Sequence, residues 1–185
     1  MSGRPPAVLP DLLRRGLTTV FCGSAAGRVS AEVGAPYAGP GNKFWPMLAE
    51  TGLTPRRFAP QEAGLLAGLG IGLTDINKAE FGSDRDLTAA GDDPDALLRK
   101  IERFRPRLVA FTAKRPAQVF LGRKAVDYGP QAGRIGRTLL FVLPSPSGLA
   151  QYWWDPGWWH RLADLHRAER AGQPSAASSA AKPAR

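Results

Sequence analysis

The chain alternates short apolar runs with longer amphipathic stretches, and this alternation restricts its fold more than any other feature. The apolar runs are LTTVFC (17–22), IGLTDI (71–76), RLVAFT (107–112) and TLLFVL (138–143). Runs of this kind suit the strands of a sheet that is covered on both faces. Because helical patterns separate them, the sequence predicts an α/β fold with a mostly parallel central sheet.

The predicted helices lie between these runs and after the last one. They are NKFWPMLAETG (42–52), PQEAGLLAGL (60–69), DDPDALLRKIERF (92–104), KRPAQVFLGRKAV (114–126) and PGWWHRLADLHRAERAG (156–172). The last helix is expected to stop at Gly172, a common helix terminator. We therefore expect an N-terminal segment over 1–16, one folded domain over 17–172, and a disordered tail over 173–185, which is rich in small residues and contains proline.

Charge and composition narrow the class of partner. Lys and Arg number 25 and Asp and Glu number 16, so the net charge is +9, and a polyanion such as nucleic acid is the first partner to test. A single cysteine, Cys22, and two histidines disfavour a metal centre, so we expect no metal and no cofactor. No apolar run approaches the roughly 20 residues that span a bilayer, and the N-terminus lacks a signal-peptide pattern. We expect a cytoplasmic monomer.

Two segments follow predicted strands and a third ends one, at the edge where open parallel sheets bind their ligands. They are GSAAG (23–27), DINK (75–78) and PSPSGL (144–149). The small residues Gly23, Ser24 and Ala25 allow backbone N–H groups to approach a ligand oxygen, although an ordinary strand exit has the same composition. Neither a GxxxxGK[ST] nor a GxGxxG pattern is present, so a nucleotide-phosphate loop is not supported.

A stiff loop rich in proline and glycine, APYAGPGNKFW (35–45), precedes the first long predicted helix. Tyr37 is a candidate stacking platform for a planar ring, since the prolines and glycines restrict the path of the loop. Asn42 is either a helix cap or a polar group of the site. Phe44 and Trp45 are expected in the core.

The loop after the last strand offers hydroxyl and amide groups to a phosphate or to the minor groove, through Ser145, Ser147 and Gly148. A plain turn between strand and helix is the alternative. Four tryptophans follow within 153–159, and we expect some of them to pack on the sheet. Gln151, Tyr152 or Trp153 is a candidate wedge for a base stack. His160 and His166 are expected to be solvated.

Taken in order, VFCGSAAG, PYAGPGNKFW, GLTDINK and LPSPSGL resemble the motifs of the uracil-DNA glycosylase superfamily, and most of all its mismatch-specific uracil/thymine branch; PQEA (60–63) adds to the likeness. The resemblance implies a three-layer α/β/α sandwich and a monofunctional glycosylase that needs no metal or cofactor. Such an enzyme flips a uracil nucleotide, or one with another deaminated base, out of DNA and releases the free base and abasic DNA.

Two departures from the family pattern affect the expected chemistry. The first motif carries Ala25 where the mismatch branch has a water-orienting asparagine, and the last motif lacks the histidine of many members. Asp75 and Asn42 then remain as catalytic candidates. A carboxylate at Asp75 would stabilise an oxocarbenium-like sugar and orient water, while the Ser24 and Ala25 N–H groups receive the anionic uracil oxygen.

Asn77 is a candidate partner for the pyrimidine edge, or else a cap in the turn after the strand. Two other functions remain open. The first is a protein that binds uracil-containing or abasic DNA with little turnover. The second, which is remote, is a nucleotide or coenzyme binder.

Overall fold

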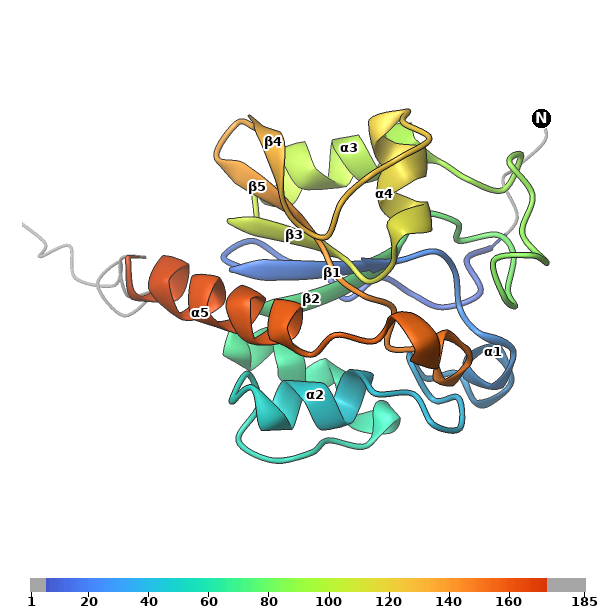
Figure 1. Cartoon of the computed structure of the whole chain (residues 1–185), viewed down its shortest axis with the longest axis horizontal. Coiled ribbons are helices and arrows are strands. Elements are labelled where there is room, and N and C mark those ends of the chain that lie inside the picture. The colour runs from blue at the N-terminus through green and yellow to red at the C-terminus, as the bar shows by residue number, and fades with distance from the viewer. Residues whose placement is uncertain (1–5, 173–185) are drawn as a thin grey trace, which may run out of the picture.

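A computed structural model describes residues 6–172, which form a five-stranded sheet with helices on both faces (Figure 1). The strands are β1 (Thr19–Gly23), β2 (Ile71–Asp75), β3 (Leu108–Phe111), β4 (Gly129–Ile135) and β5 (Thr138–Val142). They lie in the order β2-β1-β3-β5-β4, and all neighbours except β4 and β5 are parallel. The predicted α/β class and the four predicted strands are confirmed.

The strand β4 was not predicted. It pairs antiparallel with β5 at the edge of the sheet, with an irregularity between Pro130 and Arg134. Its sequence, GPQAGRI, contains two glycines and a proline, which disfavour a strand in most settings, and most of its residues are exposed. The tight turn that follows it pairs β4 with β5, so its position depends on the hairpin rather than on an apolar pattern.

Two helical layers enclose the sheet. The helices α3 (Pro94–Phe104) and α4 (Lys114–Leu121) cover one face, and α2 (Phe44–Glu50), the 3-10 helix η1 (Pro60–Leu69) and α5 (Gly157–Ala171) cover the other (Figure 1). Two short helices, α1 (Arg28–Val33) and the 3-10 helix η2 (Gly148–Trp153), were not predicted. No helix within residues 6–172 is both long enough and apolar enough to cross a membrane.

Side chains alternate between the two faces of each strand, and this alternation fixes the face on which a polar residue at the strand end must lie. Phe21 and Leu73 belong to the core beneath α2 and α5, whereas Val20 and Cys22 belong to the core beneath α3 and α4. Gly23 and Asp75 come two residues after Phe21 and Leu73. Both therefore belong to the α2/α5 face, at the carboxyl edge of the sheet.

The segment before β1 lies along the outer edge of β2. Leu12 and Leu73 exchange two backbone hydrogen bonds of 2.9 and 3.1 Å, and the Val8 N–H donates to the Lys78 carbonyl at 2.8 Å. The Leu9 side chain is buried. This segment therefore covers a sheet edge that would otherwise expose unpaired backbone groups.

The expectation that His166 is solvated is wrong. Its side chain lies in the core between α5 and the sheet, 3% exposed, and its Nδ1 atom lies 2.9 Å from the Thr19 hydroxyl. Burial and the nearby Arg170 lower the pKa of His166 from 6.5 to about 4. The ring is therefore neutral in the folded protein at neutral pH. The predicted packing of tryptophans on the sheet is confirmed, because Trp159 is fully buried.

This burial predicts a dependence of stability on pH. Below pH 6.5 the unfolded chain protonates His166, whereas the folded chain does so only near pH 4, so the free energy of unfolding should fall as the pH falls through this window. From pH 7 to pH 5 the contribution of His166 should be about 2 kcal/mol. Urea unfolding at both pH values, followed by tryptophan fluorescence, measures it. His166→Gln should lose correspondingly less stability over the same interval, and an equal loss in both proteins would contradict the prediction.

Candidate functional site

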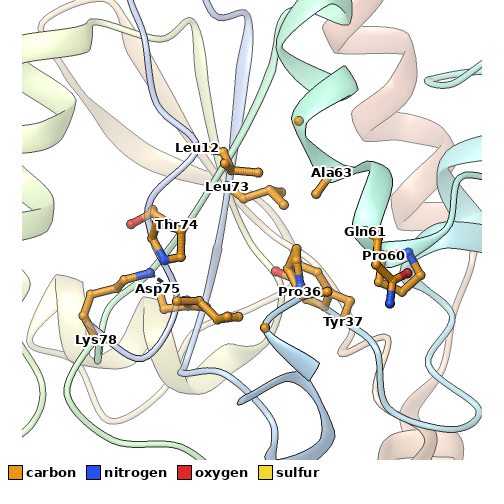
Figure 2. A pocket seen from close by; sticks show the side chains of 15 residues that line it. Leu12, Pro36, Tyr37, Pro60, Gln61, Ala63, Leu73, Thr74, Asp75 and Lys78 are labelled. Carbon is orange, nitrogen blue, oxygen red and sulfur yellow. Dashed lines mark hydrogen bonds and ion pairs between the residues drawn. The ribbon is translucent and has the colours of Figure 1, made fainter. Parts of the chain in front are cut away.

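A cavity of about 290 Å³ opens at the carboxyl end of β2, on the face that α2 and α5 cover. Four segments that are distant in sequence form it: the stretch before β1, the loop before α2, the start of η1, and the end of β2. Figure 2 shows Lys78 and Asp75 on one side of this cavity and Pro60 and Gln61 on the opposite side. The other lining residues are Leu9, Pro10, Leu12, Gly34, Ala35, Pro36, Tyr37, Ala63, Gly64, Leu73 and Thr74.

Asp75 places a carboxylate on the wall of the cavity. Its side chain is 16% exposed, and Lys78 Nζ donates a hydrogen bond of 3.2 Å to its Oδ2 atom. Burial raises the pKa of Asp75, while the ammonium group of Lys78 opposes this change. A carboxyl group with a raised pKa is a better proton acceptor than an exposed one at neutral pH, provided that it stays ionised.

Gly23 stands directly beside this carboxylate. The parallel pairing of β1 with β2 sets Gly23 against Asp75. A Cβ atom on Gly23 would lie 2.6 Å from Asp75 Oδ1 and 3.5 Å from the Tyr37 hydroxyl. The absence of a side chain at Gly23 therefore leaves the space that the carboxylate occupies.

Tyr37 is held rigidly at the cavity. Its ring stacks on Phe44, with centroids 3.8 Å apart and planes at 11°, so one face is covered. Its hydroxyl lies 3.3 Å from Thr112 Oγ1, and its backbone has a left-handed φ of 54°, which is uncommon outside glycine. Burial and the neighbouring Asp75 raise the pKa of Tyr37, so its hydroxyl stays protonated. Only the ring face opposite Phe44 is left to stack on a ligand.

The loop that carries Ser24 and Ala25 is anchored through its carbonyl groups. The Gly23 carbonyl accepts from the Ile76 N–H at 3.0 Å, and the Ser24 carbonyl accepts from the Asn77 N–H at 2.9 Å. The Ala26 carbonyl accepts from the Gly82 N–H at 2.8 Å. These bonds attach the first motif to the segment after β2, so Ser24 and Ala25 are kept beside the turn that follows Asp75.

The two asparagines make hydrogen bonds within their own loops. Asn42 Oδ1 accepts from the Phe44 N–H at 2.9 Å, at the start of α2. Asn77 is fully buried; its Oδ1 accepts from the Ala79 and Glu80 N–H groups, and its Nδ2 donates to Glu80 at 2.7 Å. Neither residue lines the cavity. The structure brings Asp75, Tyr37 and Gly23 together, and it places both asparagines in supporting turns. Gly23, Ser24 and Ala25 lie beside the cavity wall but do not line the cavity.

The last predicted site segment lies beside the loop before α2. The Lys43 N–H donates to the Pro146 carbonyl at 2.7 Å, and a Cβ atom on Gly148 would lie 2.9 Å from the Pro40 carbonyl oxygen. The Ser147 hydroxyl accepts from the Leu149 N–H, and the Ser145 hydroxyl accepts from the Ser147 N–H. These contacts hold the two loops together on one side of the molecule.

The 3-10 helix η2 projects large apolar side chains into solvent. Leu149 is 89% exposed, Tyr152 88% and Trp153 68%, and Gln151 is also exposed. Several largely exposed apolar side chains gathered on one short helix are typical of a surface that contacts a partner. Their position directly after the Ser145 to Gly148 loop makes η2 a candidate contact surface for a nucleic acid.

Sequence reasoning missed several residues of the site. Lys78 had a local signal, since it lies three residues after Asp75 in the same turn. Leu149 could have been identified as a contact residue, because it is an apolar residue in a predicted loop. Thr112, which contacts the Tyr37 hydroxyl, and the stretch around Leu12, which lines the cavity, had none, because only the pairing of distant segments brings them to these positions.

No group of three or more metal-ligating side chains is found among residues 6–172. Cys22 is a buried free thiol on the opposite face of the sheet from Asp75, and burial raises its pKa. A protonated, enclosed thiol is a poor nucleophile. Among the residues that line the cavity, the polar side-chain groups are the oxygen and nitrogen groups of Tyr37, Gln61, Thr74, Asp75 and Lys78.

Comparisons with known proteins identify the family and support the fold. Residues 10–166 match the family model of the uracil DNA glycosylase superfamily. Among solved structures, the fold is similar to the NMR solution structure of a Methanosarcina acetivorans protein that is provisionally named a uracil DNA glycosylase. That similarity has a TM-score of 0.52 at 18% sequence identity, and it covers 87% of this chain and 96% of the other.

The close approach at Gly23 predicts a local destabilisation. Gly23→Ala should reduce the free energy of unfolding by about 1–3 kcal/mol, because the added methyl group overlaps the Asp75 carboxylate in a packed wall. Gly39→Ala, in the loop before α2, is the matched control, since a Cβ there meets nothing within 4 Å. Urea unfolding measures both. Equal stability of the two variants would show that the carboxylate moves aside at no cost.

Proposed function

Because the chain belongs to the uracil DNA glycosylase superfamily, we propose that it hydrolyses the N-glycosidic bond of uracil in DNA. The observation that carries this proposal is the largely buried Asp75 carboxylate on the wall of a cavity that residues of the motifs PYAGPGNKFW, PQEA and GLTDINK line together with the stretch before β1. Such a cavity fits an enzyme that extrudes a nucleotide from DNA before it acts on the base. The products are free uracil and an abasic site.

The chemistry needs negative potential near the sugar and hydrogen-bond donors near the departing base. As the bond between C1′ and N1 breaks, its electron pair leaves with uracil and C1′ becomes electron-poor. Asp75 stabilises this cationic sugar and accepts a proton from the water whose oxygen bonds to C1′. The backbone N–H groups of Ser24 and Ala25 donate to the anionic uracil oxygen.

Tyr37 and the surrounding loops hold the substrate. The free face of the Tyr37 ring stacks on the extruded base, and base–aromatic stacking contributes about 1–3 kcal/mol. Ser145, Ser147 and Gly148 contact the DNA backbone around the extruded nucleotide. Lys43, whose Nζ lies 5.1 Å from the centre of the Trp154 ring, places a positive charge beside this loop.

We assign Asp75 rather than Asn42 as the main catalytic group. Asp75 lines the cavity, whereas the side-chain oxygen of Asn42 already accepts the Phe44 N–H. Asn77 supports the turn that holds Asp75 and is too buried to reach a pyrimidine edge. We propose that the chain belongs to the mismatch-specific uracil/thymine branch, whose motifs PYAGPGNKFW and GLTDINK resemble, and that it acts as a monomer.

A second candidate function is a protein that binds uracil-containing or abasic DNA with little turnover. Two observations favour it: Ala25 has no polar side chain to orient water, and Lys78 partly neutralises Asp75. Turnover separates the two functions. A binding protein retains uracil-containing DNA without releasing uracil, even when the protein is in excess.

The test of the function is uracil release from labelled oligonucleotides. We expect the wild-type protein to produce alkali-labile abasic sites, and Asp75→Asn to lower the single-turnover rate by about 100-fold or more, a typical contribution of a positioned proton acceptor. DNA binding by the variant should remain within about 3-fold of wild type. Asn42→Ala should retain most of the activity. Loss of activity in Asn42→Ala with full activity in Asp75→Asn would reverse the assignment.

The exposed side chains of η2 predict a difference between duplex and single-stranded substrates. Extrusion from a duplex leaves a gap, and an inserted apolar side chain offsets the lost stacking. Replacing Leu149 and Tyr152 together by alanine should slow uracil release from duplex DNA at least about tenfold more than from single strands, because a few kcal/mol of stacking are at stake. Gln151→Ala tests the polar neighbour separately.

Leu65→Ala is the control for this experiment, because Leu65 is 53% exposed on η1 and does not line the cavity. It should leave both rates unchanged. An equal loss on both substrates in the double variant would instead assign η2 to the binding of the strand that carries uracil.

A further inference from the structure

A carboxylate outside the predicted domain, Asp11, is tied to the wall of the cavity. Asp11 Oδ2 lies 2.7 Å from Lys100 Nζ, and Asp11 Oδ1 lies 3.2 Å from Lys78 Nζ. The Thr74 hydroxyl donates to Asp11 Oδ1 at 2.7 Å. The charged side chains in these contacts are between 15% and 25% exposed, so they are well shielded from water. Both oxygens of Asp11 are therefore engaged in specific contacts.

Lys78 bridges this carboxylate and the proposed catalytic one. Its Nζ atom lies 3.2 Å from Asp11 Oδ1 and 3.2 Å from Asp75 Oδ2. The ammonium group is thus shared evenly between two carboxylates. It contacts Oδ2 of Asp75, whereas Oδ1 is the oxygen next to Gly23.

The backbone fixes the position of Asp11. The two hydrogen bonds between Leu12 and Leu73 set the residue before Leu12 against the end of β2. The bond from the Val8 N–H to the Lys78 carbonyl attaches the same segment to the turn that carries Lys78. Asp11 and Lys78 are therefore held at a constant separation by main-chain contacts as well as by charge.

We propose that Asp11 is a positioning residue of the active site, which acts on Asp75 by holding Lys78 at a shared location between the two carboxylates. The inference rests on the proposed function and extends it to a residue outside the family's motifs. Lys78 orients Asp75 through Oδ2 and leaves Oδ1 directed toward the first motif. Without Asp11, Lys78 pairs with Asp75 alone, and the negative potential available to a cationic sugar falls.

Because charged groups surround Asp75, this arrangement predicts how the rate of uracil release depends on pH. The titratable groups around Asp75 are Lys78 from its own turn, Asp11 from the N-terminal segment, Lys100 from α3 and the Tyr37 hydroxyl from the loop before α2, with the Cys22 thiol of β1 on the opposite face of the sheet. The two lysines lower the pKa of Asp75 and Asp11 raises it. Removing Asp11 and removing Lys78 must therefore shift the pKa of Asp75 in opposite directions.

The test compares Asp11→Asn, Asp11→Glu and Lys78→Met with wild type, with Glu102→Gln, an exposed carboxylate on α3, as the control. The single-turnover rate of uracil release is measured against pH.

Asp11→Asn should lower the rate at the pH optimum about tenfold and shift the acidic limb to lower pH. Lys78→Met should shift that limb to higher pH by on the order of one unit. Asp11→Glu should restore most of the rate, and Glu102→Gln should match wild type.

A ¹³C NMR titration of the Asp75 carboxyl group measures its pKa directly, without an activity assay, in wild type and in each variant. The Asp75 signal is assigned by its loss in Asp75→Asn. If the wild-type protein releases no uracil, the proposed function fails, yet opposite pKa shifts in the two variants still support the network. If uracil release depends on Asp75 but both variants keep the wild-type pH profile and titration, the positioning role is overturned. A rate that falls equally at every pH, with Asp11→Glu as impaired as Asp11→Asn, would also overturn it, since that is the result of a merely structural contact.

Discussion

The parallel pairing of β1 with β2 is the constraint on which the site depends. It sets Gly23 against Asp75, so that a carboxylate emerges at the sheet edge two residues after Leu73, on the same face as the core beneath α2 and α5. Hydrogen bonds from Ile76 and Asn77 to the Gly23 and Ser24 carbonyls extend this pairing past the strands. The first motif and the end of β2 therefore form one rigid unit, and a shift in their register by one residue would turn Asp75 into the opposite core.

Placing a carboxylate there has an electrostatic cost that the neighbouring segments offset. An ionised group loses hydration on burial, and the loss is tolerable only when charged or hydrogen-bonding partners replace water. Lys78 and Lys100 supply two positive charges, and Asp11 and Asp75 supply two negative ones. The four charges sum to zero, and opposite charges alternate within the cluster. The cluster therefore fixes the orientation of the Asp75 side chain and contributes little to the free energy of unfolding. The segment before β1, which pairs with β2 through its backbone, thus also supplies one of the four charges.

The sequence predicted the parts of the molecule whose signal is local. Runs of apolar residues marked four strands, and polar residues directly after them marked Asp75 and the loop of Ser24 and Ala25. The remaining parts depend on contacts between distant segments. The edge strand β4 has a sequence unfavourable to strands, His166 looks like a surface residue within an arginine-rich helix, and Asp11 becomes part of a charge network only when its segment pairs with β2. No pattern within a short window carries that information.

The presence of Asp75 offers a physical explanation for how the site could work with Ala25 in the first motif. Alanine in the first motif removes a polar side chain but leaves its N–H group, and the neighbouring strand supplies a charged oxygen beside the same loop. A carboxylate is a stronger proton acceptor than an amide, and it stabilises an adjacent positive charge directly. Its disadvantage is that a free carboxylate also repels an anionic leaving base. Lys78 on Oδ2 reduces that repulsion on one side while Oδ1 remains negative, so the direction of the carboxylate decides whether both requirements are met.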